Sequence, residues 1–266
     1  MWITSRSNPA VVATAALKEK KFREKEHRFL LEGFKLLEEA VRSGVALERV
    51  FVTESAVKAC AKIAPHLEMI PVSDGVYEKM STEKSPQGVI CVAKYLDKIH
   101  NINKIYTIED FSESKRRFLL LSSLRDPGNL GTVIRSAAAF GCDELILSHD
   151  CADLYHPRTV RAAMGTLFRQ RVSVVPSLPD AVKAMTDGGY RVYAAVLDDR
   201  AERLDTMHID ARTAFVIGNE GHGIDPAVIE AAGRTAYIPM ASGVESLNAA
   251  AAAAVLLWQA SLSQHS

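Results

Sequence analysis

The segment that most constrains the fold lies near the C-terminus, where a short apolar strand expected to end at Pro239 leads through a Ser/Gly turn into six alanines, Ala249–Ala254. Ser246 and Asn248 precede the alanines, and such side chains accept hydrogen bonds from the unpaired N–H groups of a helix start. Alanine combines high helix propensity with almost no side-chain bulk. We therefore expect a helix over residues 247–260 on which another helix, a threaded backbone or a partner chain packs closely. A capped helix in an ordinary tight core is the alternative.

Composition places the chain among globular proteins. With 266 residues, 48% hydrophobic and 24% charged, it is expected to form two domains. No apolar run reaches the roughly 18–20 residues that cross a bilayer, and the N-terminus lacks the layout of a secretory signal. The four cysteines are scattered, without partners at zinc spacing, which favours buried thiols and predicts no metal site. We expect a cytoplasmic protein with no membrane partner.

Charge is unevenly distributed although the net charge is zero. Residues 1–96 hold 15 Lys/Arg against 12 Asp/Glu, whereas residues 97–266 hold 17 against 20. The positive excess concentrates in Lys18–Arg28, where six cations meet three anions. A solvated helix face with local ion pairs and a patch that contacts phosphates both explain this segment, and charge alone does not separate them.

Helical and strand patterns alternate through the first 96 residues, as in a small three-layer α/β domain. Phe34–Arg42 is expected to form an amphipathic helix that Gly44 ends. The other expected elements are helices over 9–20, 55–63 and 73–80, and strands over 29–32, 50–53, 69–72 and 88–93. Residues 97–116 are polar and aperiodic, and we interpret them as a linker whose stiffness is undetermined.

The alternation is clearer over residues 117–266. Its apolar runs are continuous, which is typical of the fully buried strands of a parallel sheet. Strands are expected over 118–122, 144–147, 172–175, 191–196, 214–217 and 236–239, and helices over 130–140, 179–186, 226–232 and 247–260. We therefore predict a second α/β domain with a parallel sheet.

Two more segments follow strand ends, where open α/β sheets bind their ligands. In Arg125–Arg135, Asn129 is expected to cap a helix that carries Arg135. In Val216–Ile224, three glycines and Glu220 follow a strand directly, and glycine lets a ligand approach the backbone. The spacing matches neither the dinucleotide fingerprint nor the P-loop. An N-cap with a surface arginine and a plain turn are the structural alternatives.

The three segments resemble, in order and spacing, the motifs of SpoU (TrmH-like) RNA 2′-O-ribose methyltransferases of the SPOUT superfamily. The matching stretches are Asn129-x-Gly131-x-x-x-Arg135, Gly218-Asn-Glu-Gly-His-Gly223, and Ile238-Pro-Met240 with Ser246-Leu-Asn248. Val160–Phe168 is also similar to that family, and Phe29–Gly33 is similar to its attached substrate-binding domain, which is related to small kink-turn-binding ribosomal proteins. Ala249–Ala250 departs from the Val-Ser of many relatives, which we expect to affect packing rather than chemistry.

The resemblance implies a parallel sheet whose C-terminal part forms a deep trefoil knot, S-adenosylmethionine held in the knot, and a homodimer through the C-terminal helix. It assigns RNA binding to residues 1–96 and methyl transfer to residues 117–266. The residues implied to line the catalytic pocket are Asn129, Arg135, Glu220, Ser246 and Asn248. The residues implied to bind the cofactor are Gly218, Asn219, Gly221, Ile238, Met240 and Leu247.

Methyl transfer to a ribose 2′-hydroxyl needs in-line positioning and a group that takes or offsets the hydroxyl proton. Arg135 is often proposed as the base in this family, but a guanidinium is effectively always protonated. We therefore interpret Arg135 as an RNA phosphate anchor that also stabilises alkoxide charge, with Glu220 or water taking the proton.

Structured ribosomal RNA, first of all 23S RNA, is the expected target. Transfer RNA and a non-catalytic RNA-binding role are alternatives. An ordinary dinucleotide-binding enzyme is disfavoured, because Pro127–Gly131 does not carry the required glycine pattern.

Overall fold

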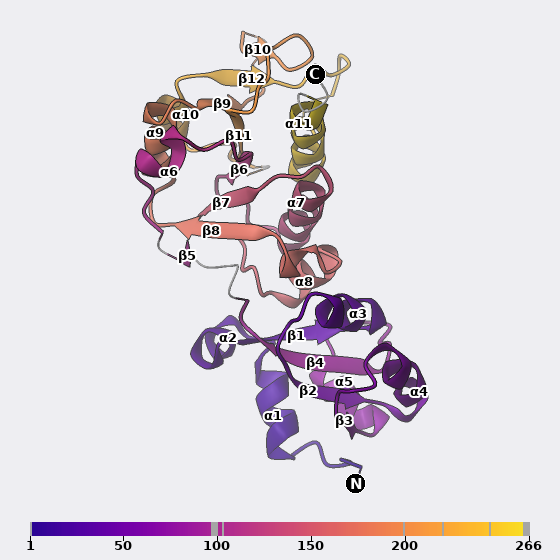
Figure 1. Cartoon of the computed structure of the whole chain (residues 1–266). Helices are drawn as coiled ribbons and strands as arrows, with labels where there is room; N and C mark the ends of the chain where they lie inside the picture. The colour runs from indigo at the N-terminus through magenta and orange to yellow at the C-terminus, as the bar shows by residue number, and fades with distance from the viewer. Residues whose placement is uncertain are drawn as a thin grey trace. The chain divides into compact units, whose positions relative to one another are not determined.

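The computed structural model describes residues 2–96, 101–102, 104–198, 200–219, 221–244 and 246–262. The chain forms two compact units (Figure 1). The first comprises Met1–Asp97 and Asp153–Arg169, and the second comprises Lys98–Ala152 and Gln170–Ser266. A segment from the middle of the chain therefore folds with the N-terminal residues.

The first unit is built on a four-stranded sheet in the order β1-β4-β2-β3. β4 is antiparallel to both of its neighbours, whereas β2 and β3 are parallel. In chain order its N-terminal elements are α1 (Pro9–Ala16), α2 (Lys20–Glu26), β1 (Arg28–Glu32), α3 (Phe34–Arg42), β2 (Leu47–Val52), α4 (Glu54–Ile63), β3 (Met69–Pro71), α5 (Asp74–Met80) and β4 (Val89–Lys94). The predicted alternation is confirmed, including the bounds of α3.

The first two helices divide where the sequence pattern predicted a single helix. α1 ends at Ala16 rather than at residue 20, and α2 begins separately at Lys20. The guanidinium of Arg23 donates hydrogen bonds to the carbonyl oxygens of Leu17 (2.8 Å) and Lys18 (2.7 Å). Because carbonyls at a helix end have no partner inside the helix, these bonds stabilise the break.

The basic segment Lys18–Arg28 had two explanations, a solvated helix face or a patch that contacts phosphates, and the structure excludes both of them for Arg23. Its side chain is 1% exposed and forms an ion pair with the carboxylate of Asp153. Arg23 is therefore neither part of a solvated face nor available to a phosphate. Two exposed lysines of the segment pair with neighbouring glutamates, which supports the ion-paired helix face at those positions.

The segment Asp153–Arg169 packs closely within the first unit. It contains α8 (Pro157–Ala162) and a short 3-10 turn (Thr166–Phe168). The ring of Tyr155 stacks on that of Tyr95, with centroids 3.8 Å apart. Gly165 has a φ of +86°, and a Cβ there would lie 2.5 Å from the Cβ of Glu39. The 3-10 turn and α3 therefore approach each other as closely as a glycine allows.

The second unit contains an eight-stranded sheet in the order β10-β12-β9-β11-β6-β7-β8-β5. All of its strand pairs are parallel, which confirms the predicted parallel sheet. The strands are β5 (Asn101–Ile102), β6 (Phe118–Leu121), β7 (Glu144–Ser148), β8 (Arg171–Val175), β9 (Arg191–Ala195), β10 (Glu202–Arg203), β11 (Thr213–Ile217) and β12 (Thr235–Tyr237). The two-residue strands β5 and β10, at the sheet edges, were not predicted.

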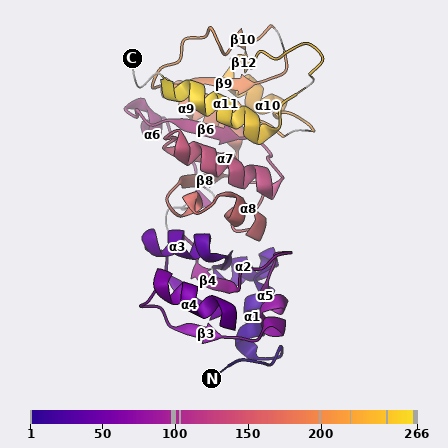
Figure 2. The same ribbon diagram turned by 90° about the vertical axis from the view of Figure 1, so that its right-hand side faces the viewer.

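Helices cover both faces of this sheet. They are α6 (Glu109–Ser112), α7 (Pro127–Ala139), α9 (Leu178–Asp187), α10 (Pro226–Ala232) and α11 (Ala249–Leu262). α7 and α11 pack against each other on one face, and α6, α9 and α10 lie on the other (Figures 1 and 2). Ala249, Ala250 and Ala253 of α11 are buried. The expected close packing of the alanine helix is thus confirmed, and its neighbour is α7.

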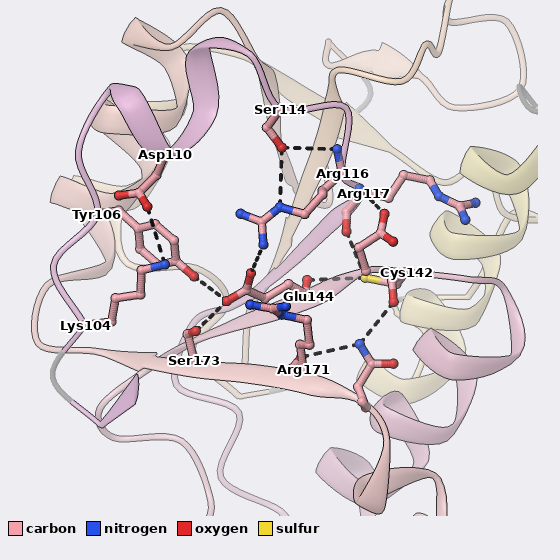
Figure 3. A network of polar contacts seen from close by, with 12 residues as sticks. Lys104, Tyr106, Asp110, Ser114, Arg116, Arg117, Cys142, Glu144, Arg171 and Ser173 are labelled. Atoms are coloured by element: carbon pink, nitrogen blue, oxygen red, sulfur yellow. Dashed lines mark hydrogen bonds and ion pairs between the residues drawn. The ribbon is translucent and has the colours of Figure 1, made fainter. Parts of the chain in front are cut away.

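The part of the expected linker that follows residue 103 is fastened to the sheet (Figure 3). The carboxylate of Glu144, on β7, is 2% exposed and accepts hydrogen bonds from Tyr106 Oη (2.6 Å), Ser173 Oγ (2.5 Å) and Arg116 Nη1 (2.8 Å). Burial and the neighbouring Glu144 raise the pKa of Tyr106, which keeps its phenol protonated as the donor. The segment around α6 therefore belongs to the second unit. Residues 97–100 and 103 lie outside the described residues.

Candidate cofactor and catalytic site

A cavity of about 420 Å³ lies at the carboxyl ends of β9, β11 and β12, which are neighbours in the sheet. This volume falls in the range of roughly 300–1,000 Å³ that is common for small-molecule sites. The cavity wall continues into the first turn of α11 through Ala249 and Ala252. The site therefore joins two of the three sequence segments singled out above.

All six residues expected to bind the cofactor line this cavity. They are Gly218, Asn219, Gly221, Ile238, Met240 and Leu247. Ser246, from the expected catalytic set, lines it as well. A further wall that was not predicted comes from the end of β9, from Ala195 to Leu197. Leu197 is 70% exposed, and its position directly after a predicted strand was the available signal.

The glycine at position 218 is required by a tight loop closure. The backbone N–H of Asn219 donates to the carbonyl of Gly223, and the N–H of Gly223 donates to the carbonyl of Asn219, both at 2.9 Å. A Cβ on Gly218 would lie 2.3 Å from the carbonyl carbon and oxygen of Gly223. Only a glycine at this position lets the loop fold back on itself beside the cavity.

The side chain of Asn219 organises the same loop. Its Oδ1 accepts hydrogen bonds from the backbone N–H groups of Gly221 (2.8 Å) and His222 (3.3 Å). Its Nδ2 donates to the carbonyl of Ser123 (3.1 Å), at the exit of β6. Asn219 therefore ties the cavity loop to a second strand end.

The expected cap of α7 is corrected by the structure. Asp126, not Asn129, is the N-cap, and its Oδ1 accepts the backbone N–H of Asn129 at 2.8 Å. Pro127 then occupies the first helical position, where its fixed φ suits a helix and its missing N–H is no loss. The Asn129 side chain is consequently used elsewhere, and its Oδ1 accepts a hydrogen bond from Asn248 Nδ2 (3.1 Å).

Asn248 is the N-cap of α11, as predicted. Its Oδ1 accepts the backbone N–H groups of Ala250 (3.0 Å) and Ala251 (3.3 Å). It directly follows Leu247, a cavity residue. The contact with Asn129 thus places the third sequence segment, at the start of α7, beside the cavity.

Of the expected catalytic residues that the structure describes, Ser246 lines the cavity, Asn129 and Asn248 lie beside it, and Arg135 does not reach it. Arg135 is exposed on α7, six residues and so about 120° around the helix from Asn129. Its side chain makes no hydrogen bond or ion pair with the part of the chain that the structure describes, and it does not line the cavity. Glu220 lies outside the described residues.

Among the described residues, no three His, Cys, Asp or Glu side chains gather as a metal site. Within the same ranges, no helix has the length and apolar character needed to cross a membrane.

Comparisons with known proteins place this geometry in a family. Residues 116–258 match the SpoU rRNA Methylase family, and residues 8–91 match the MRM3-like substrate binding domain. The chain belongs to the SpoU rRNA methylase family. Members of this family are S-adenosylmethionine-dependent RNA 2′-O-ribose methyltransferases, so the resemblance and the enzyme class drawn from the motifs are confirmed.

The similarity extends over nearly the whole chain. The 23S rRNA (guanosine(2553)-2′-O)-methyltransferase RlmP of Bacillus subtilis is 30% identical, and the match covers 96% of this chain and 97% of that protein. A crystal structure of an RNA 2′-O ribose methyltransferase has a TM-score of 0.84 at 28% identity, with full coverage of both chains. An AdoMet-bound rRNA methyltransferase from Sinorhizobium meliloti has a TM-score of 0.80 at 28% identity, and the match covers 98% of this chain and 97% of that one.

Proposed function

We propose that this protein transfers a methyl group from S-adenosylmethionine to a ribose 2′-hydroxyl of ribosomal RNA, with 23S RNA as the first candidate. The observation that carries the proposal is one strand-end cavity that two of the sequence segments line, with the third held beside it by the contact between Asn129 and Asn248. The Bacillus subtilis relative that methylates 23S rRNA, and spans the same length, supports the choice of RNA.

The cavity fits S-adenosylmethionine chemically. The apolar side chains of Ile224, Ile229 and Ile238 line the cavity, and an adenine ring can pack against them. Because Gly218, Gly221 and Gly223 have no Cβ atoms, a ligand can reach the backbone polar groups of these residues. When bound, the cofactor supplies a methyl group activated by its sulfonium. The chain contributes binding, orientation and exclusion of water.

The proposal extends to the roles of individual side chains. Asn248 fixes the orientation of the Asn129 amide, so that Asn129 is held beside the cavity and can orient the ribose. Arg135, exposed on α7, anchors an RNA phosphate and offsets negative charge on the attacking oxygen. Glu220 or water accepts the hydroxyl proton.

The domain roles belong to the same proposal. Residues 1–96 bind the RNA substrate, and residues 117–266, apart from Asp153–Arg169, form the methyltransferase domain, whose C-terminal part is threaded as a trefoil knot. The expected linker, residues 97–116, connects the two domains, and its part after residue 103 is held against the sheet of the second unit. The match of residues 8–91 to a substrate binding domain supports the first role. We place the protein in the cytoplasm.

The proposal also includes a homodimer through α11 and the knot region. Val255, Trp258 and Leu262 are 37%, 50% and 43% exposed, and their spacing puts them on one side of α11. Sedimentation of the wild-type protein and of Trp258→Glu tests this arrangement. A wild-type protein that sediments as a monomer at micromolar concentration would contradict it.

The function is tested by mapping 2′-O-methyl groups across total RNA from cells with and without the gene, complemented by wild type or Arg135→Ala. One site in 23S RNA should vanish without the gene and return only with the wild type. A gene-dependent site in transfer RNA would shift the target to the alternative substrate. Loss of no site, or absence of S-adenosylmethionine binding by the purified protein, would overturn the proposal.

A further inference from the structure

Ser123, two residues beyond the end of β6, has an unusual backbone. Its φ is +56°, in the left-handed region that costs a non-glycine residue roughly 1–2 kcal/mol. Both of its backbone polar groups are engaged by side chains from other strand ends. Its N–H donates to Ser148 Oγ (2.9 Å), and its carbonyl accepts from Asn219 Nδ2 (3.1 Å). The conformation is therefore held from two sides.

Ser148, which accepts the N–H of Ser123, is itself hydrogen-bonded to an acidic residue. It is the last residue of β7, is 8% exposed, and donates from Oγ to Asp150 Oδ1 (2.6 Å). The other carboxylate oxygen of Asp150 forms an ion pair with Arg125 (3.2 Å). Burial works to raise the pKa of Asp150, but its hydrogen bonds from Ser148, Ser123 and Arg125 outweigh this and lower it, so the group is a carboxylate.

Each hydrogen bond in this series has only one possible direction. A carboxylate can only accept, so the Ser148 hydroxyl must donate to it. The Ser148 oxygen is then left to accept the N–H of Ser123. The Ser123 carbonyl in turn admits only the N–H₂ end of the Asn219 amide, which turns Oδ1 towards the backbone N–H groups of the cavity loop.

We propose that Ser148 and Asp150 are positioning residues for the cofactor, acting through Ser123 and Asn219 on the loop Gly218–Gly223. Neither residue lines the cavity. Their effect is to keep the loop closed around the backbone groups that the cofactor contacts. This inference rests on the proposed use of S-adenosylmethionine at that cavity.

A double-mutant cycle tests this relay, by which we mean the series of hydrogen bonds that runs from Asp150 through Ser148 and Ser123 to Asn219. Ser148→Ala is expected to weaken S-adenosylmethionine binding, measured by calorimetry, roughly three- to ten-fold, as for loss of one hydrogen bond. The same substitution in an Asn219→Ala background should change the affinity less than about two-fold, because the relay is already cut there. Asp150→Ala should follow Ser148→Ala.

A second readout needs no cofactor. In the protein alone, amide hydrogen exchange in a peptide covering the loop Gly218–Gly223 should be faster in Ser148→Ala than in wild type. Without Ser148, the Ser123 carbonyl no longer holds the Asn219 amide in place, and the Asn219 oxygen then protects the loop N–H groups less well. Ser177→Ala is the matched control. Ser177 Oγ also accepts a backbone N–H, that of Asp180 (3.3 Å), at the start of α9, and its loss should leave both readouts unchanged.

The outcomes separate this inference from the proposed function. A wild-type protein that does not bind S-adenosylmethionine contradicts the function itself. If wild type binds but Ser148→Ala binds equally well, the positioning role is wrong. If Ser148→Ala weakens binding by the same factor in both backgrounds, its effect does not pass through Asn219, and the relay is overturned.

Discussion

Asn248 donates a hydrogen bond from Nδ2 to Asn129 Oδ1 at 3.1 Å, and so joins side chains 119 positions apart in the sequence. The same Asn248 caps α11 through Oδ1. One amide therefore performs two tasks, fixing the start of a helix and orienting a neighbouring side chain beside the cavity. The two tasks can be separated by substitution.

Asn248→Ser should retain the cap, because a serine oxygen also accepts helix N–H groups, but it removes the bond to Asn129. Its rate of methylation of 23S RNA from cells lacking the gene should fall at least about ten-fold, with little change in the free energy of unfolding. Asn248→Ala should lose a similar rate and also about 1 kcal/mol of stability. Label transfer from S-adenosylmethionine and urea unfolding measure the two effects. Full activity in Asn248→Ser would refute a role for the contact.

Gly218→Ala should weaken S-adenosylmethionine binding more than about ten-fold, because the new Cβ overlaps the backbone of Gly223. Gly233→Ala is the control. Gly233 has a φ of +64° and open space around the position of a Cβ. Gly233→Ala should cost about 1 kcal/mol of stability and leave the affinity unchanged. Calorimetry on both variants gives the comparison, and equal affinities would show that the loop does not close on the cofactor.

Much of this site was predictable because its residues follow strands. A continuous apolar run predicts a parallel strand, and residues after such runs gather at one sheet edge. Gly218, Ile238 and Leu247 could thus be placed near one another from sequence. The family resemblance, rather than the pattern, supplied the cofactor and the role of each residue.

Other features had no signal in a single sequence. The left-handed backbone of Ser123 is set by partners on other strands, since serine itself does not favour it. The burial of Arg23 depends on Asp153, far along the chain. The helix start at Pro127 was readable from its Asp-Pro pair, but the following Asn129 was equally good cap chemistry. Rules that use only neighbouring residues therefore miss conformations that contacts between distant parts of the chain determine.

Asp153→Ala should lower the free energy of unfolding by about 3 kcal/mol, because it leaves the buried guanidinium of Arg23 without its counter-charge. Asp187→Ala is the matched control, since Asp187 and Lys183 form an exposed pair at 3.1 Å. That pair is expected to contribute less than about 0.5 kcal/mol. Urea unfolding compares the two variants, and a small effect of Asp153→Ala would show that solvent reaches Arg23.

Alkaline pH should destabilise the protein through its buried thiols. Burial raises the pKa of Cys60 to about 11, whereas an unfolded thiol titrates near about 8.5. Because the folded state favours the neutral thiol, this contribution is complete below the unfolded pKa and is lost as pH rises towards the folded one. From about pH 7.5 to 9.5, wild type should lose about 1 kcal/mol more stability than Cys60→Ala. Equal losses would mean that Cys60 ionises normally.

Arg135→Lys separates a phosphate anchor from a simple positive charge. A guanidinium forms paired hydrogen bonds with a phosphate, whereas an ammonium keeps the charge without that geometry. The variant should therefore lose roughly ten- to a hundred-fold in kcat/KM for RNA, and Arg135→Ala should lose more. S-adenosylmethionine affinity should be unchanged in both, because Arg135 does not line the cavity. Methylation kinetics and calorimetry on the same preparations check this. Near-full activity of Arg135→Lys would rule out the paired anchor, and a loss of cofactor binding would move Arg135 from the RNA to the cofactor site.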